Sequence, residues 1–461
     1  MIRREVELIV AGGSVVTVDR DRRIIANGSL AIDGQSIVAV GKRDEIERAY
    51  VARRTVEARD ALVMPGFVDA HNHPIHYMTK GATDDLPFEH RMRTIVAPYE
   101  QGLSDEEAYL NATATFAEMI MNGTTCFNDA GSMPGDGVAH AARDIGIRGV
   151  LALESVDVTG GVRRTERGRD SDAVADNADA FVGRWHGAEH GRLRAGFTLN
   201  NPHRVSDELC RAIKSLSDDR GVGIHGHMTI REPASRPPGW ASPLHRYRDL
   251  GLLGPRLSLV HLGYVAGSDV ALLADAGVKG VHCPGTSSLG GIGVITHGTI
   301  PEMMAAGMTF GLGSDAATVS RFLDMIRHMY LACAVHKDAR RADVVISCYK
   351  ALEMATIDGA GAILWEDEIG SLEPGKRADI AIVDATDLEL HPNPHLNPVA
   401  NLVYSGSGRS VRTVIIDGRI VMEDRVLKTV DVAELCRQLG EAAPGVLARS
   451  GAGVRPLWPI V

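Results

Sequence analysis

The sequence lacks paired cysteines and long hydrophobic runs, and each shortage excludes a class of protein. Its six cysteines are scattered with no Cys-x-x-Cys pair. They indicate buried thiols in a reducing compartment, and neither a disulfide framework nor a cysteine-based zinc site. No apolar run approaches the roughly 20 residues of a membrane-spanning helix, and the first residues lack the apolar stretch of a signal peptide. We therefore expect a cytoplasmic protein with no membrane contact.

Positive charge is also in short supply. Lys and Arg number 49 against 59 Asp and Glu, which gives a net charge of -10. Binding to nucleic acid phosphates needs clustered cations, which an acidic chain with dispersed arginines does not provide, so we expect no nucleic-acid partner. The remaining composition is that of an ordinary globular protein. A chain of 461 residues exceeds the usual size of one core and predicts either a large domain with an accessory domain or two to three domains.

Short β-rich segments separated by glycine-containing turns occupy both ends of the chain. The strand candidates are 8–11, 14–18, 29–32 and 36–40 near the start, and 378–383 and 411–418 near the end. Neither set is large enough to bury a core by itself. We therefore predict one small β-sandwich, built jointly by residues 1–61 and residues 366–461.

Residues 62–365, between these ends, alternate apolar strand-like runs with helix-like segments such as 105–121 and 206–216. The strand candidates are 62–68, 124–128, 149–154, 195–199, 222–226, 257–261, 280–283 and 309–312. Eight alternating units in this length predict an α/β fold, a (β/α)8 TIM-type barrel. A doubly wound open sheet is the alternative, but no Gly-x-Gly-x-x-Gly turn follows an early strand.

The first predicted barrel strand ends in His71-Asn72-His73. Residues two apart on an extended chain point to the same side, so both imidazoles can bind one metal ion. Chance histidine pairs are common in a chain with 18 histidines, so this motif alone does not decide between a metal site and a structural pair.

Four more polar residues fall at predicted strand ends, the edge at which barrels of this type place their active sites. They are His203, His227, His261 and Asp315. Neutral imidazoles with one carboxylate suit an ion such as Zn2+, which lowers the pKa of a coordinated water to about 7. Asp315 can take a proton from that water and pass it to a leaving group. This set of residues indicates hydrolysis.

The sequence resembles the amidohydrolase superfamily, in particular the aminohydrolase branch of adenosine-type and S-adenosylhomocysteine deaminases and triazine hydrolases. The resemblance covers essentially the whole chain. The motifs that carry it are 65–73 (Pro-Gly-Phe-Val-Asp-Ala-His-Asn-His), 118–125, 146–148 (Gly-Ile-Arg), 202–203 (Pro-His), 282–284 (His-Cys-Pro), 312–315 (Leu-Gly-Ser-Asp) and 370–379.

The resemblance implies a role for each matching residue. The implied metal ligands are His71, His73, His227 and Asp315. Asp315 and His261 would be catalytic, with His261 orienting the attacking water or polarising the substrate. The implied substrate contacts are Glu100, Arg148, His203 and His282. An ion pair is the alternative for Glu100 and Arg148, and support of the metal ligands is the alternative for His282.

The same resemblance bears on the number of metal ions. Binuclear relatives carry a bridging lysine at the fourth strand, but none of the eight lysines lies at a strand end near residue 200, so we expect a single ion. Zn2+ is the expected ion, and Fe2+ and Mn2+ also accept these ligands. The resemblance further implies a small-molecule substrate and a homo-oligomer.

One departure from the family affects the substrate. The deaminases usually have His-x-x-Glu at the fifth strand, and that glutamate protonates the ring nitrogen of the substrate. Here the sequence reads His227-Met228-Thr229-Ile230, and isoleucine can transfer no proton, although Glu232 could reach in from the loop.

We therefore expect a metal-dependent hydrolase that cleaves a C–N bond, or a carbamate- or thiocarbamate-type bond, of a small aromatic or heterocyclic molecule. One alternative is a hydrolytic deaminase of a purine or pyrimidine base or nucleoside. Another is a catalytically idle, metal-binding relative.

Overall fold

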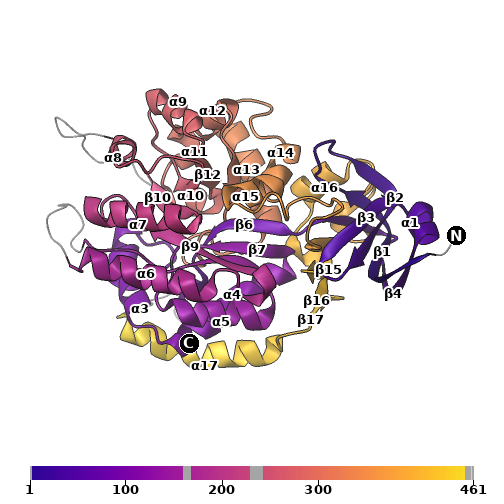
Figure 1. Cartoon of the computed structure of the whole chain (residues 1–461), viewed down its shortest axis with the longest axis horizontal. Coiled ribbons are helices and arrows are strands. Elements are labelled where there is room, and N and C mark those ends of the chain that lie inside the picture. The colour runs from indigo at the N-terminus through magenta and orange to yellow at the C-terminus, as the bar shows by residue number, and fades with distance from the viewer. Residues whose placement is uncertain (1–2, 159–167, 229–241, 452–457, 459–461) are drawn as a thin grey trace.

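Two sheets form the framework of the chain (Figure 1). The structure, a computed structural model, describes residues 3–158, 168–228, 242–451 and 458. One sheet has eight strands in the order β13-β12-β11-β10-β9-β8-β7-β6. The other has nine strands in the order β17-β16-β15-β14-β5-β1-β2-β3, with β4 paired to β1.

The eight-stranded sheet is parallel throughout and is the predicted barrel. Its strands are β6 (Phe67–Asn72), β7 (Thr124–Asp129), β8 (Arg148–Ala152), β9 (Leu193–Leu199), β10 (Ile224–Met228), β11 (Leu257–His261), β12 (Lys279–His282) and β13 (Phe310–Leu312). An isolated bridge between Asn72 and Asp315 joins the two edge strands. The predicted (β/α)8 class is confirmed.

Helices cover the outside of the barrel. They and the short helical turns among them are η1 (Pro74–Thr79), α2 (Phe88–Arg91), η2 (Met92–Val96), α3 (Ala97–Gln101), α4 (Asp105–Met121), α5 (Gly135–Ile145), α6 (Ser171–Trp185), η3 (Glu189–Gly191), α7 (Asp207–Arg220), α8 (Pro243–Asp249), α9 (Gly267–Asp275), α10 (Pro284–Gly290), α11 (Val294–His297), α12 (Ile300–Ala305), α13 (Met325–Arg340), α14 (Cys348–Met354) and α15 (Ile357–Ala362).

Local sequence explains where α4 and α7 begin, the two helices that correspond to the predicted helical segments 105–121 and 206–216. At the start of α4 the Ser104 hydroxyl accepts from the Glu107 amide, and the Glu107 carboxylate accepts from the Ser104 amide, which makes a capping box. At the start of α7 the Ser206 hydroxyl accepts from the Leu209 amide. That helix continues to Arg220, beyond the predicted end, and stops at Gly221 with φ +68°.

The predicted strand 62–68 is two strands, which corrects the sequence interpretation. β5 (Ala61–Pro65) belongs to the nine-stranded sheet and β6 begins the barrel. Gly66 separates them, and its amide donates to the Asp379 carbonyl. A Cβ at Gly66 would lie 2.1 Å from the side chain of Thr125. Both strands are buried, so the apolar run is continuous and hides the break.

The nine-stranded sheet is the predicted small domain, and both chain ends build it. The first part supplies β1 (Arg4–Val16), β2 (Ile24–Asp33), β3 (Ser36–Lys42), α1 (Arg43–Ala49), β4 (Tyr50–Glu57) and β5; the last part supplies β14 (Ile380–Asp384), β15 (Val411–Ile416), β16 (Arg419–Glu423) and β17 (Val426–Leu427). Antiparallel pairing of β5 with β14 joins the two parts. Their apolar side chains share one buried cluster, which includes Leu8, Val63 and Ile380.

The C-terminal helix returns from the small domain to the barrel. After η4 (Leu388–Leu390), α16 (Pro398–Ser405) and η5 (Gly408–Ser410), helix α17 (Val432–Arg449) runs back along the barrel (Figure 1). Leu435 and Val446 are its buried apolar residues, and Arg449 pairs with Glu107 of α4. Of the helices described, none combines the length and the hydrophobicity needed to cross a bilayer.

Candidate metal centre

A cluster of imidazoles and one carboxylate lies at the carboxyl ends of the barrel strands. His71 comes from β6, His227 from β10 and His261 from β11, while His73 and Asp315 follow the ends of β6 and β13. The ligand atoms of His71, His73 and His227 lie within 4.8 Å of one another, and so do those of His71, His261 and Asp315. The structure thus brings together every predicted metal ligand and catalytic residue.

His71 presents one nitrogen to the centre of this cluster. Its Nδ1 lies 2.7 Å from Nε2 of His225. Its Nε2 is buried, has no hydrogen-bond partner among the residues that the structure describes, and lies 3.7 Å from Oδ1 of Asp315. A buried nitrogen without a partner is costly unless something binds it. A metal ion at this position would remove that cost.

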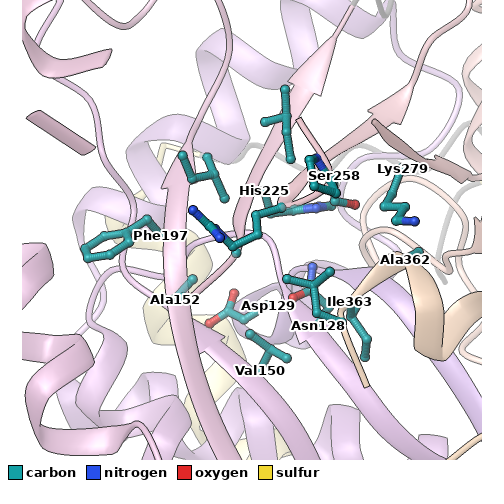
Figure 2. A pocket seen from close by; sticks show the side chains of 17 residues that line it. Asn128, Asp129, Val150, Ala152, Phe197, His225, Ser258, Lys279, Ala362 and Ile363 are labelled. Atoms are coloured by element: carbon teal, nitrogen blue, oxygen red, sulfur yellow. The ribbon is translucent and has the colours of Figure 1, made fainter. Parts of the chain in front are cut away.

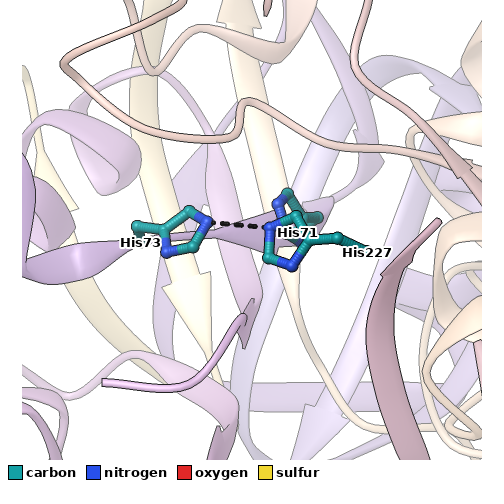
Figure 3. Close-up of side chains that lie close together, drawn as sticks. All are labelled: His71, His73 and His227. Atoms are coloured by element: carbon teal, nitrogen blue, oxygen red, sulfur yellow. Dashed lines mark hydrogen bonds between the residues drawn. The ribbon is translucent and has the colours of Figure 1, made fainter. Parts of the chain in front are cut away.

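His227 and His73 face the same position. Nδ1 of His227 donates to the Asn200 carbonyl at 2.7 Å, which leaves Nε2 as the nitrogen with a free lone pair. That Nε2 lies 3.3 Å from Nε2 of His73 (Figure 3). Nε2 of His73 is 3.7 Å from Oδ1 of Asp315. Three imidazole nitrogens and one carboxylate are a donor set that fits a divalent ion such as Zn2+.

Burial disfavours the charged forms of His73, His227 and His261, and the imidazoles around Asp315 favour its carboxylate form. Burial lowers the pKa of His227 to about 4 and that of His261 to about 3, and it holds the pKa of His73 well below its usual value. Burial by itself would raise the pKa of Asp315, but the neighbouring imidazoles of His71, His261 and His73 hold it well below its usual range. These are the protonation states that metal binding requires.

A hydrogen-bonded frame fixes the end of β13 against β6. The Asp69 carboxylate accepts from the Ser314 amide at 2.9 Å and also from the Ser314 hydroxyl. The Asn72 side chain donates to the Asp315 carbonyl at 2.6 Å. Gly313 allows the close approach, because a Cβ there would lie 2.8 Å from Cβ of His71. The frame sets the position of Asp315 relative to the histidines.

Of the predicted substrate contacts, Glu100 lies next to the cluster. It sits on α3 and is 2.7 Å from Nε2 of His76. The His76 ring stacks on the His73 ring, with centroids 5.2 Å apart and planes 3° apart. Sequence reasoning missed His76, which stands on η1 three residues after His73 with no apolar run to mark it.

His203 and His282 lie outside the cluster. His203 is exposed in the turn after β9, where its amide donates to the side chain of Asn201 at 3.0 Å. His282, at the end of β12, is fully buried, and its Nε2 lies 3.2 Å from Nε2 of His336. Its neighbours favour the supporting role over a substrate contact.

Arg148 is in a different part of the molecule, which corrects the expectation that it contacts a substrate. It is the first residue of β8, at the end of the strand opposite the cluster, and it is fully buried. Its guanidinium donates to both oxygens of Asp379, at 2.6 and 3.0 Å, and to Asp417 at 2.7 Å. The ion-pair alternative therefore describes Arg148, which links the barrel to the small domain.

Sequence reasoning also missed a polar network beside His227. The Asn200 side chain donates to Glu154 at 2.8 Å, and Arg204 lies 3.3 Å from the same carboxylate oxygen. Burial raises the pKa of Glu154. Glu154 ends the strand candidate 149–154 and Asn200 follows the strand candidate 195–199, so the position at a strand end is the signal that could have found them. Ile230 and Glu232, on which the substrate argument depends, lie outside the described residues.

Comparisons with known proteins agree with this geometry. The sequence model of the Amidohydrolase family matches residues 62–421. A curated 5-methylthioadenosine/S-adenosylhomocysteine deaminase of Desulfitobacterium hafniense is 31% identical over 430 residues, which are 91% of this chain and 94% of that protein. A protein of the same name from Symbiobacterium thermophilum is 32% identical over 443 residues, with coverages of 95% and 98%.

Two solved structures have a similar fold. A zinc-bound adenosine deaminase of Xanthomonas campestris superimposes with a TM-score of 0.90 at 25% identity, covering 97% of this chain and 100% of that one. An atrazine chlorohydrolase of Arthrobacter aurescens in complex with zinc superimposes with a TM-score of 0.85 at 22% identity, covering 95% and 100%. At its lower identity the second likeness shows the shared fold only.

Proposed function

Since this chain belongs to the amidohydrolase family, we propose that it is a metal-dependent hydrolase that cleaves a C–N bond of a small aromatic or heterocyclic molecule. The observation that carries the proposal is that the ligand atoms of His71, His73 and His227 lie within 4.8 Å of one another, with Oδ1 of Asp315 3.7 Å from Nε2 of both His71 and His73. These four residues would hold one divalent ion. Zn2+ is the expected ion, because zinc is bound in the adenosine deaminase structure and because three imidazoles with one carboxylate suit this ion.

The residues of the chain would handle the protons of the reaction. A bound ion would supply a water of lowered pKa and polarise the substrate. Asp315 is held as a carboxylate, so it can accept a proton from the attacking water and deliver it to the leaving nitrogen. Nε2 of neutral His261 lies 3.8 Å from Oδ2 of Asp315, where it can orient the water or the substrate by a hydrogen bond.

For the substrate, we favour a neutral amide, urea or carbamate-type carbonyl compound. Hydrolytic deamination of a nucleobase needs an acid that protonates the ring nitrogen. The segment 227–230 has isoleucine where the family's deaminases usually have that glutamate. A carbonyl substrate needs no ring protonation, because polarisation of the carbonyl and a proton from Asp315 to the leaving amine suffice.

A nucleoside or nucleobase deaminase is the second candidate. The curated relatives at 31% and 32% identity carry a deaminase name and are matched over more than nine tenths of their length. Glu100, beside His76, would offer a hydrogen-bonding group to a polar part of such a substrate. Glu154 or Glu232 would then have to supply the missing acid.

A substrate panel distinguishes these candidates. Zinc-loaded protein is incubated with anilides, phenylureas and carbamates, and separately with adenosine, methylthioadenosine, S-adenosylhomocysteine, guanine and cytosine. We expect release of the amine from a member of the first group and negligible ammonia from the second. Fast ammonia release from a nucleoside or base would establish the deaminase instead. No turnover on either panel by protein that binds zinc would favour the idle relative.

We also propose that the protein acts in the cytoplasm as a homo-oligomer on a small-molecule substrate. All six cysteines are free thiols, and five of them are buried, as suits a reducing compartment. The proposal of an oligomer rests on the family resemblance alone.

A further inference from the structure

A small cavity inside the barrel is lined by His225, whose Nε2 lies 2.7 Å from Nδ1 of the proposed metal ligand His71. Figure 2 shows Asp129, His225 and Ser258 among the side chains that line it. The cavity has a volume of about 40 Å3. A buried water needs roughly 10–15 Å3 by this kind of measure, so the cavity has room for about three waters.

Three polar atoms in the wall of this cavity lack partners. They are Nδ1 of His225, Oδ2 of Asp129 and Oγ of Ser258, and each is buried without a hydrogen bond to any described residue. The three residues are 5%, 1% and 7% exposed. Buried polar atoms in native proteins nearly always have a partner, in protein or in ordered water. A partner for these atoms must therefore be able to occupy the cavity.

The hydrogen bond between the two histidines determines which nitrogen of His225 carries a proton. If Nε2 of His71 binds a metal, neutral His71 carries its proton on Nδ1. That Nδ1–H donates to Nε2 of His225 at 2.7 Å. Neutral His225 must then carry its own proton on Nδ1, the nitrogen that has no partner among the described residues. It requires a hydrogen-bond acceptor in the cavity.

We propose that His225 is a positioning residue for His71, and that the cavity binds ordered waters that join Nδ1 of His225 to Asp129 and Ser258. The inference rests on the proposed metal ligands. The hydrogen bonds would run without a break from His71 to His225, then through water to the carboxyl group of Asp129. This series of hydrogen bonds fixes the tautomer and the ring orientation of His71, as outer hydrogen bonds do at other metal sites.

The test measures Zn2+ affinity by competition with a chelator. We expect His225→Leu to weaken Zn2+ binding by about 10–100-fold, the usual effect of losing such a partner. His225→Gln can still accept from Nδ1–H of His71 through its amide oxygen and should stay within a few-fold of wild type. His328→Leu, which removes another buried imidazole, one that contacts the Phe322 carbonyl, is the matched control and should bind Zn2+ as wild type does. Equal affinity of wild type and His225→Leu would overturn the inference.

A second measurement does not depend on how the variants fold. Histidine 15N spectra of zinc-loaded wild type should show His225 protonated at Nδ1, and a high-resolution crystal structure of that form should show water at this atom. A proton on Nε2 of His225, or a dry cavity, would overturn the inference. Failure of wild type to bind any metal would instead overturn the proposed metal site, so the two failures are distinguishable.

Discussion

At the scale of single residues, both predicted catalytic groups sit in an uncommon backbone conformation. Asp315 has φ +62° and His261 has φ +73°. Residues other than glycine seldom adopt positive φ, and those held there cluster at functional sites where the surroundings compensate the strain. For Asp315 the compensation is visible, since its amide donates to the His71 carbonyl at 2.8 Å and its carbonyl accepts from Asn72.

Replacing Asp315 by asparagine tests its role in proton transfer. Asn tolerates the same positive φ, so the fold should be kept, but an amide cannot accept the proton of the attacking water. We expect the kcat of the zinc-supplemented Asp315→Asn variant to fall by about 10²–10⁴-fold. Asp218→Asn, at an exposed ion pair with Lys214, is the control and should keep full activity. An Asp315→Asn variant with more than about a tenth of wild-type kcat would contradict this role.

At the scale of the elements, a buried ion pair joins β8 of the barrel to the small domain. Arg148 and its partners Asp379 and Asp417 are each at most 5% exposed. Removing one member of a buried ion pair leaves the others charged and desolvated, which is far more costly than losing an exposed pair. The group acts as a structural joint between the two domains.

Substitution of Arg148 should therefore affect stability. We expect Arg148→Ala to lower the free energy of unfolding in urea by about 3–5 kcal/mol. Arg53→Ala, which breaks an exposed pair with Glu5, should lower it by no more than about 1 kcal/mol. If the Arg148→Ala variant were as stable as wild type and had a raised KM, that result would contradict the structural role of Arg148 and support a contact with the substrate.

The same elements explain what could be predicted from the sequence. His71, His73, His227, His261 and Asp315 could be found because each follows or ends an apolar run, and parallel strands bring such ends to one edge. The role of Arg148 could not be predicted from the sequence, because its partners lie 231 and 269 residues away in the chain. The boundary between β5 and β6 at Gly66 could not be predicted either, because two buried strands in succession have one continuous apolar pattern.

At the scale of the whole molecule, many histidines are buried in neutral form. Burial lowers the pKa of His227, His328 and His336 to about 4 and that of His261 to about 3, with His73, His225 and His282 well below the ordinary value. These side chains take up protons only when the chain unfolds. Below the ordinary histidine pKa of 6.5 these histidines therefore bind more protons in the unfolded state than in the folded state. They outnumber the buried carboxyls of Asp69 and Asp129, whose pKa of about 7 in the folded state has the opposite effect.

The metal-free protein should consequently lose stability as the solution is acidified. We expect each such histidine to lower the free energy of unfolding by up to about 1.4 kcal/mol per pH unit below about pH 6.5, as measured by urea unfolding of chelated protein. His328→Gln removes one of these groups. The free energy of unfolding of this variant should therefore fall less steeply with decreasing pH than that of wild type, because unfolding takes up one proton fewer. A free energy of unfolding that stays constant from about pH 7 to about pH 5 would contradict these neutral histidines.

The central claim is that His71, His73, His227 and Asp315 hold the ion on which hydrolysis depends. The most direct test measures metal content and amine release on the same samples of wild type and His227→Ala, before and after chelation and return of Zn2+. We predict one ion per wild-type chain, turnover that is lost on chelation and restored by Zn2+, and neither ion nor turnover in His227→Ala. Turnover that persists in metal-free wild type, or in His227→Ala without a bound ion, would contradict the claim.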